Sequence, residues 1–279
     1  MNLILQATHD IRAEPLAYLQ QLAGTQNIAK IAPNVWCLHG AQIHAQLSAY
    51  CFAQQIDFGF VPAAQKLSDF GLVVMDMDST LINIECIDEI ADMQGLKPQV
   101  AQITEAAMRG ELDFAESLRR RVALLKGLDE SALQRVYDER LQLNPGAEKM
   151  LLVLKKYGIK TLLVSGGFMF FSERLKARLG LDCAYANTLE VEHGKLTGRV
   201  LGDIVDAQAK ANFLIQTREA LSLQASQVVA MGDGANDLLM MRAARMGIAY
   251  HAKPVVREQA SYALNFVGLD GLCHLLGSH

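Results

Sequence analysis

The sequence predicts an α/β protein with a doubly wound parallel sheet, interrupted by a helical insertion and preceded by a small α+β domain. From residue 69 onward, short apolar runs alternate with amphipathic helical patterns, and each run ends in a polar or glycine-rich turn. Residues 85–144, patterned throughout as helices, separate the first two of these units. We therefore predict an N-terminal module (1–68), an α/β core (69–84 and 145–279) and a helical cap (85–144).

Composition and charge narrow the class of protein. The chain of 279 residues is 51% apolar and 20% charged, which is typical of a globular protein. Its net charge of −4 provides no general attraction for nucleic acid or for an anionic membrane. The five cysteines show no metal-ligand spacing, which favours reduced thiols and a cytoplasmic location. No apolar run approaches about 20 residues, so we expect neither a signal peptide nor a membrane span.

The N-terminal module shows its own pattern. Strand-like runs at 3–7, 35–38 and 58–61 alternate with helical patterns at 15–22 and 43–54. Its histidines match no metal-binding spacing, and no ligand motif is visible. We expect a dimerisation or regulatory module, and hence a homodimer, with a purely stabilising role as the alternative.

Four apolar runs and four helical patterns predict the elements of the core and the cap. The runs predict strands at 72–75, 161–164 and 228–231, with a weaker one at 248–250. The insertion predicts helices at 87–93, 100–109, 113–125 and 131–141. The carboxyl ends of parallel strands meet at one edge, where ligands bind, and an insertion directly after the first strand is well placed to form a lid.

Two carboxylates, Asp76 and Asp78, follow the first apolar run. If the strand continues through them, their side chains share one face and lie about 6–7 Å apart. Such a pair is repulsive unless a cation, a shared proton or a substrate compensates. The pair is therefore a candidate for chemistry.

Three other groups should reach the same edge. Residues 165–167, Ser-Gly-Gly, offer a hydroxyl and backbone N–H groups where we expect a helix to begin, which suits a phosphate oxygen. Lys210 lies in a helical run and supplies a positive charge. The turn at 232–237 adds Asp233 and Asp237. Several carboxylates beside glycine-rich turns call for a hard divalent cation, and Mg²⁺ is the expected one.

Other classes of site explain less of the pattern. An aspartic protease would need glycine at Thr80 and a second copy of the motif. Glycoside hydrolysis by paired carboxylates would leave Lys210 and the 232–237 turn without a role. The turn also lacks the small residue that closes a dinucleotide-binding motif, and no Walker lysine motif is present.

Four segments, in this order, carry a family resemblance: Asp76-Met-Asp-Ser-Thr-Leu-Ile-Asn-Ile-Glu85, Phe114-Ala-Glu-Ser-Leu-Arg-Arg-Arg121, Val164-Ser-Gly-Gly-Phe168 and Gly232-Asp-Gly-Ala-Asn-Asp237. Residues 70–279 resemble the haloacid dehalogenase-like superfamily of aspartyl-nucleophile phosphatases and, within it, the phosphoserine phosphatase family. The resemblance implies a Rossmann-like core with a cap, preceded in several members by an ACT-like module. It also implies hydrolysis of O-phospho-L-serine to L-serine and phosphate, the last step of serine biosynthesis.

The resemblance further implies roles for the residues of the core. Asp76 would be the nucleophile that forms an aspartyl-phosphate, and Asp78 the general acid and then the base. Lys210 would restrain Asp76 and bind the phosphoryl group. Mg²⁺ would be held by Asp76, the backbone carbonyl of Asp78 and Asp233, with Asp237 in support.

The two ends of phosphoserine would meet different residues. Ser165 and Gly166 would bind phosphoryl oxygens, and Asn236 would orient the substrate near them. Glu85 would face the ammonium group, and Arg121 would bind the carboxylate through two hydrogen bonds. The resemblance also implies an apolar wall, formed by Met108 and Phe114.

Two alternatives stay open at this point. The enzyme could transfer the phosphoryl group to another alcohol or hydrolyse a different small phosphomonoester. The chain could instead be a non-catalytic sensor built on the N-terminal module, although the intact set of Asp76, Asp78, Lys210 and Asp233 argues against it.

Overall fold

Seven strands form the core sheet of this computed structural model, which describes residues 1–277 apart from the side chain of Met108. In chain order they are β5 (Leu72–Met75), β6 (Lys160–Phe168), β7 (Cys183–Glu192), β8 (Lys195–Leu201), β9 (Val228–Gly232), β10 (Met246–Tyr250) and β11 (Tyr262–Leu264). Their order across the sheet is β11-β10-β9-β5-β6-β7-β8, and every neighbouring pair is parallel except β7 with β8. The strand that precedes the two carboxylates therefore lies at the centre of a parallel sheet.

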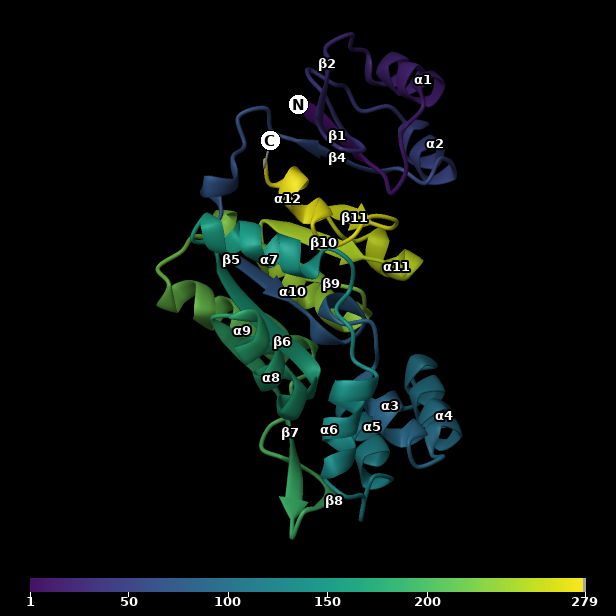
Figure 1. Ribbon diagram of the computed structural model, residues 1–279, viewed down its shortest axis with the longest axis vertical. Helices are drawn as coiled ribbons and strands as arrows, with labels where there is room; N and C mark the ends of the chain where they lie inside the picture. Colours follow the sequence, from purple (N-terminus) through teal and green to yellow (C-terminus); the bar gives the residue numbers. More distant parts are fainter. Residues whose placement is uncertain (278–279) are drawn as a thin grey trace.

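Helices cover both faces of this sheet (Figure 1). Alternate residues of β5 enter different cores: Val73 and Met75 pack with one set of helices, and Leu72 and Val74 with the other. The first set is α7 (Ala147–Lys156), α8 (Met169–Leu179) and α12 (Gly271–Leu275). The second set is α9 (Ala207–Ala220), α10 (Leu238–Ala243) and α11 (Pro254–Arg257). The prediction of a doubly wound α/β core is confirmed.

The insertion folds as four helices at one end of the molecule: α3 (Cys86–Asp92), α4 (Lys97–Met108), α5 (Phe114–Ala123) and α6 (Ser131–Glu139). The two chain segments that lead into and out of it pair at Ile82 and Leu143. The cap also touches the β7–β8 hairpin, where the Gly127 N–H donates to the Leu196 carbonyl at 2.8 Å and the Leu196 N–H donates to the Leu128 carbonyl at 2.8 Å. The cap is thus held at the paired segments around Ile82 and Leu143, which we call the crossing, and by the β7–β8 hairpin. The sequence did not predict this hairpin.

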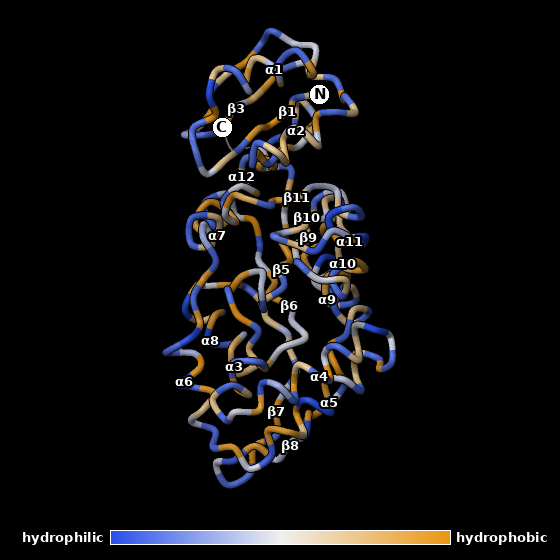
Figure 2. Tube along the Cα trace, turned by 90° about the vertical axis from the view of Figure 1, so that its right-hand side faces the viewer, coloured by the Kyte–Doolittle hydropathy of each residue, from blue (hydrophilic) through white to orange (hydrophobic). Residues whose placement is uncertain are grey.

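The N-terminal module lies at the other end of the long axis (Figure 2). Its elements are β1 (Asn2–Gln6), α1 (Ala13–Ala23), β2 (Ile28–Ala32), β3 (Val35–Leu38), α2 (Leu47–Ala53) and β4 (Asp57–Val61). They form an antiparallel sheet in the order β2-β3-β1-β4, and the β-α-β-β-α-β sequence of elements is ferredoxin-like. The strand β2 was missed because it is half-exposed and contains two alanines, which have low β-propensity.

A buried carboxylate joins the module to the core. Asp57, at the start of β4, is 1% exposed and accepts hydrogen bonds from the backbone N–H groups of Asn265, Phe266 and Val267 at 2.8, 2.8 and 3.0 Å. The Asn265 side-chain amide donates to it as well, at 3.1 Å. Nearby, the Tyr262 hydroxyl donates to the Phe60 carbonyl at 2.7 Å. The module is therefore anchored on the segment that follows β11.

Candidate active site

Asp76 and Asp233 lie at the carboxyl ends of two adjacent strands, β5 and β9. The strand β5 ends at Met75, and residues 77–81 form a tight turn in which Ser79 has a φ of 56°. The expectation that Asp76 and Asp78 share one face of a continuing strand is therefore wrong. Both lie where the backbone reverses, and the Ile82 N–H closes the turn on the Met77 carbonyl at 3.0 Å.

Lys210 links two carboxylates. Its ammonium group lies 2.8 Å from Asp76 Oδ2 and 2.8 Å from Asp237 Oδ1, and its side chain is 1% exposed. The helix α9 delivers this lysine, and its first turn is capped by the Asp206 side chain. Burial alone would lower the pKa of Lys210, but the carboxylates of Asp237 and Asp76 outweigh it and raise that pKa. Lys210 is therefore a fixed positive charge behind Asp76.

Three carboxylates form a cluster that suits a metal ion. Oxygen atoms of Asp76, Asp233 and Asp237 lie within 4.8 Å of one another. Burial, then Asp237 and Glu85, raises the pKa of Asp233 to about 6, which shows that negative charge is crowded here. An all-carboxylate donor set fits a hard divalent cation.

The metal prediction for Asp78 concerns its backbone carbonyl. Its carboxylate is not part of the three-residue cluster among the described residues. The role of that carbonyl stays a prediction.

The Asp78 carboxyl has a different environment from that of Asp76. Its Oδ2 accepts one long hydrogen bond, 3.4 Å, from the Cys86 N–H, and its buried Oδ1 has no partner among the described residues. Burial and then the nearby Glu85 carboxylate raise the pKa of Asp78 to about 8. Asp78 is therefore suited to carry a proton at neutral pH, whereas Asp76 is paired with a cation.

The segment at 165–167 is held from two sides. Ser165 is buried, and its hydroxyl accepts a hydrogen bond from the Gly167 N–H at 2.8 Å. The Asn187 side chain donates to the Gly166 carbonyl at 2.8 Å, and its oxygen accepts the Val205 N–H at 2.9 Å. The expected helix start at this segment is wrong, because β6 continues to Phe168 and α8 begins at Met169. The backbone N–H groups come from the irregular end of a strand.

The cap closes over this segment. A Cβ atom on Gly166 would come within 2.7 Å of the Phe114 ring, so only glycine allows the cap residue to lie there. A Cβ atom on Gly167 would come within 2.9 Å of Asp78 Oδ2. These two glycines let Phe114 and Asp78 approach the backbone of the 165–167 segment.

A cavity of 710 Å³ opens between the core and the cap. Its described lining includes most of the expected site residues: Asp76, Asp78, Glu85, Phe114, Arg121, Ser165, Gly166, Asp233 and Asn236. Lys210 and Asp237 lie behind Asp76 rather than on the wall. The side chain of Met108 is outside the described residues, so its predicted place in the apolar wall is not addressed.

Glu85 and Arg121 stand on the cap side of the cavity. The Ser79 hydroxyl donates to Glu85 Oε1 at 2.6 Å. Partial loss of hydration raises the pKa of Glu85, and this hydrogen bond partly reverses the effect. Arg121 Nε donates to the Ser117 carbonyl at 3.4 Å, and no carboxylate of the described residues pairs with the guanidinium. Its remaining donors are therefore available to a ligand in the cavity.

Several residues of the site escaped the sequence-based prediction. The Thr80 hydroxyl donates to Asp233 Oδ1 at 3.1 Å, and its place four residues after Asp76 was a usable signal. Asn187 supports the 165–167 segment from a strand that was not predicted. The segment around it, Ala184-Tyr-Ala-Asn-Thr-Leu-Glu-Val, is also similar to the family, but no role for Asn187 was drawn from it. Asp88 and Lys253 also line the cavity. Asp88 lies on the cap helix α3 and Lys253 follows β10, so only the packing of the cap and the sheet brings these two residues to the cavity.

Comparisons with known proteins agree with this geometry. The model of the haloacid dehalogenase-like hydrolases matches residues 70–245, and a domain of unknown function, DUF4072, matches residues 3–47. A phosphoserine phosphatase from Polaromonas sp. is 55% identical over 216 residues, which is 76% of this chain and 92% of that protein.

Solved structures give the same result. The crystal structure of a probable phosphoserine phosphatase from Vibrio cholerae has a TM-score of 0.86 at 39% identity and covers 99% of this chain and 85% of its own. A phospho-aspartyl intermediate analogue of phosphoserine phosphatase has a TM-score of 0.69 at 40% identity, and the match covers 74% of this chain and 98% of that one. The chain belongs to the haloacid dehalogenase-like hydrolases and, within them, to the phosphoserine phosphatase family.

Proposed function

We propose that this chain hydrolyses O-phospho-L-serine to L-serine and phosphate. One observation carries the proposal: a single cavity holds Asp76 and Asp78 at one end and Glu85 and Arg121 on the cap side. The first pair suits phosphoryl transfer, and the second pair matches the opposite charges of an amino acid. Release of serine and phosphate is the last step of serine biosynthesis, the role typical of this family.

The proposed reaction uses the two aspartates in turn. An Asp76 carboxylate oxygen forms a bond to phosphorus while the bond from phosphorus to the serine oxygen breaks. The leaving oxygen takes the proton of Asp78, whose raised pKa keeps that proton at neutral pH. In the second half, the Asp78 carboxylate takes a proton from water, the water oxygen attacks phosphorus, and the bond to Asp76 breaks.

The surrounding groups position the phosphoryl group. Lys210 fixes the Asp76 carboxylate through the ion pair at 2.8 Å. The Ser165 hydroxyl and the backbone of Gly166 line the cavity where phosphoryl oxygens would bind, and Asn236 lies across from them on the same wall. These contacts would be made without rearranging the central sheet.

We infer that the cation at the three-carboxylate cluster is Mg²⁺. Asp76, Asp233 and Asp237 supply oxygen ligands, and the backbone carbonyl of Asp78 is adjacent in sequence. When bound, Mg²⁺ neutralises charge on the phosphoryl oxygens and tolerates phosphate as a ligand.

The test of the function is phosphate release from a panel of phosphomonoesters, with phosphoserine preferred. EDTA should abolish the release and Mg²⁺ should restore it. Asp76→Asn should reduce kcat by about 10³-fold or more while keeping the thermal unfolding transition of a folded protein. Wild-type turnover by this variant would contradict the assignment of Asp76 as nucleophile. Equal turnover of all esters would contradict the assignment of phosphoserine as the preferred substrate.

We further infer a cytoplasmic homodimer. Two features of the chain support this inference: all five cysteines are free thiols, and the N-terminal module presents its own sheet at one end of the molecule. Among the described residues, no helix is long and apolar enough to cross a membrane. Light scattering on the purified protein distinguishes a dimer from a monomer.

A further inference from the structure

The wall of the active-site cavity has an excess of negative charge. Its described lining carries five carboxyl groups, on Asp76, Asp78, Glu85, Asp88 and Asp233. Its cationic lining residues are Arg121 and Lys253. Even with Asp78 protonated, the acids outnumber the cations. A divalent cation at Asp76, Asp233 and Asp237 and the Lys210 ammonium group would offset the negative charge at the inner end. On the cap side, Glu85 and Asp88 would repel an approaching anion unless positive charge lies near its path.

The substrate makes this imbalance important. Phosphoserine carries about −1.5 to −2 on its phosphate at neutral pH, together with one carboxylate and one ammonium group, so it is an anion overall. Arg121 is partly buried, and its charge already faces Asp88, Glu85 and Asp78. These nearby acids therefore offset part of the attraction of Arg121 for an anion.

Lys253 differs from Arg121 in both respects. It is exposed, and no ion pair or side-chain hydrogen bond is found for it among residues 1–277. Its backbone is nevertheless fixed, because its carbonyl accepts the Val256 and Arg257 N–H groups at 3.0 and 3.1 Å. Among the described residues its ammonium group is therefore unpaired, while hydrogen bonds hold its backbone in place.

The base of this segment is fixed by His251. Its N–H donates to the Leu264 carbonyl at 2.8 Å, and its ring Nε2 lies 3.1 Å from the Val267 carbonyl oxygen. These contacts tie the end of β10 to β11 and to the segment after it. Lys253 therefore stays on the core side of the cavity, with Val255 and Val256 beside it on the wall.

The sheet places this charge within electrostatic reach of Asp76. Lys253 follows β10, which pairs with β9, which pairs with β5. The strands β10 and β5 lie two strand spacings apart, about 10 Å, and Lys253 follows the end of β10 and lines the same cavity as Asp76. The Debye length is about 8 Å at physiological ionic strength. A charge at this range attracts an approaching anion, but salt weakens the attraction strongly.

We propose that Lys253 is a recognition residue that captures the phosphomonoester dianion at the mouth of the cavity and guides it towards Asp76. This role rests on the proposed function and adds a residue to it. Lys253 increases the rate and affinity of substrate capture, so it acts on kcat/KM. It takes no part in the bond-breaking step, so kcat is independent of it.

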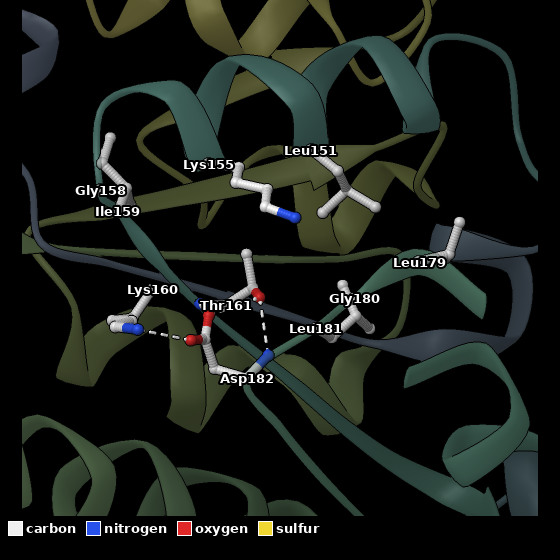
Figure 3. Close-up of a pocket in the computed structure, with 10 residues that line it drawn as sticks. All are labelled: Leu151, Lys155, Gly158, Ile159, Lys160, Thr161, Leu179, Gly180, Leu181 and Asp182. Atoms are coloured by element: carbon white, nitrogen blue, oxygen red, sulfur yellow. Dashed lines mark hydrogen bonds and ion pairs between the residues drawn. The ribbon is translucent and has the colours of Figure 1, made fainter. Parts of the chain in front are cut away.

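The test compares Lys253→Gln and Lys253→Glu with a matched control, Lys155→Gln. Lys155 is also an exposed lysine, but it lines a separate hollow beside Lys160 and Asp182, at the starts of β6 and β7 and so at the opposite edge of the sheet (Figure 3). The control removes the same charge from the molecule without altering the cavity. Each variant is assayed with phosphoserine at saturating Mg²⁺ over a range of KCl concentrations.

At low salt, Lys253→Gln should lower kcat/KM by about two- to fivefold and Lys253→Glu by about tenfold, as expected for one charge near a dianion. The kcat values should stay within about twofold of wild type. The differences should shrink towards about 1 M KCl, where the Debye length is about 3 Å. Lys253→Arg should retain the wild-type kcat/KM, and Lys155→Gln should match wild type at every salt concentration.

Two results would overturn the proposal. One is a kcat/KM for Lys253→Gln equal to that of Lys155→Gln, and the other is a loss that persists unchanged at high salt, which would indicate a structural effect. Both are measured in an enzyme that turns over phosphoserine, so they leave the proposed function intact. A wild-type protein that releases no phosphate from phosphoserine would instead contradict the function and the capture role together.

Discussion

At the scale of single residues, the local environment gives two aspartates of one motif different properties. Asp76 faces the buried ammonium group of Lys210 at 2.8 Å, whereas Asp78 has an unpartnered buried oxygen. Burial raises the pKa of both carboxyls, and at Asp76 the Lys210 ammonium group at contact distance partly reverses the rise. The tasks proposed above, nucleophile for Asp76 and proton donor for Asp78, would use this difference.

Arg121 is the residue on which the substrate assignment can be tested most directly. Arg121→Ala should raise KM for phosphoserine by about 10–100-fold, because a two-pronged charged contact contributes about 1.5–3 kcal/mol. KM for p-nitrophenyl phosphate, which has no carboxylate, should change by less than about threefold. Steady-state kinetics with both substrates measures the change in each KM.

Arg120→Ala is the matched control for this variant. Arg120 is on the same helix but exposed, and its Nε pairs with Glu116 at 2.7 Å. It should leave both KM values unchanged. A rise in KM that is equal for the two substrates would reject Arg121 as the carboxylate ligand.

At the scale of elements, the crossing between the core and the cap is built from side-chain amides. Asn144 donates to the carbonyls of Thr80 and Ile82 at 2.8 and 3.0 Å, and its backbone N–H donates to the Leu81 carbonyl at 3.0 Å. Asn83 accepts the Gln142 N–H at 3.0 Å. The turn that carries Asp78 is thus fastened to the segment that returns from the cap.

Asn144→Ala should lower the free energy of unfolding by about 1–3 kcal/mol, because two partly buried carbonyls lose their donor. Urea denaturation measures this change. The control Asn83→Ala, at an exposed position of the same crossing, should lose less than about 1 kcal/mol. A loss at Asn144 no larger than that at Asn83 would show that the crossing does not depend on the Asn144 amide.

At the scale of the whole molecule, the N-terminal module and the cap lie on opposite sides of the core (Figure 1). Asp57 anchors the module to residues 265–267, and the carbonyl of Val267 contacts the ring of His251. A continuous set of contacts therefore runs from the module to the base of the segment that carries Lys253. The module supports the core side of the cavity through this anchor.

Asp57→Ala should lower the free energy of unfolding by about 3 kcal/mol or more, because three backbone N–H groups lose a buried acceptor. Calorimetry or urea denaturation measures the loss. The control Asp10→Ala removes a carboxylate that is 74% exposed and pairs with Lys30 at 3.4 Å. It should change stability by less than about 0.5 kcal/mol, and an equal loss in both variants would contradict the anchor.

The stabilisation by Asp57 should also depend on pH. Burial raises the pKa of this carboxyl, and the backbone N–H groups of Val267, Asn265 and Phe266 only partly offset the rise. The folded protein then holds the proton more tightly than the unfolded chain. This contribution is complete below the unfolded pKa of about 3.9 and is lost as pH rises through the raised value.

The stability difference between wild type and Asp57→Ala should accordingly narrow as pH rises from about 4 towards neutrality. Urea denaturation at a series of pH values measures that difference. A difference that widens over the same range would show that the hydrogen bonds outweigh the burial of the charge.

Much of the architecture was predictable because it depends on local pattern. The apolar runs at 72–75 and 228–231 and the helical periodicity of the cap correspond closely to β5, β9 and the helices α3–α6. The strands β7, β8 and β11 were missed. The first two form a hairpin with much exposed surface, and the third has only three residues, so their pairing partners rather than their composition stabilise them.

The sequence by itself determined the chemistry available to this protein: two aspartates after a central strand, a lysine in a later helix, and acids with an arginine in an insertion. The tertiary structure decided that Asp237 pairs with Lys210 as well as Asp76, where β6 ends, and how Asp57 is buried against residues 265–267. Residue types and their spacing are local properties that can be read along a chain. Burial, charge separation and pKa depend on residues that are distant in sequence, and these became defined only when the sheet and the cap brought them together.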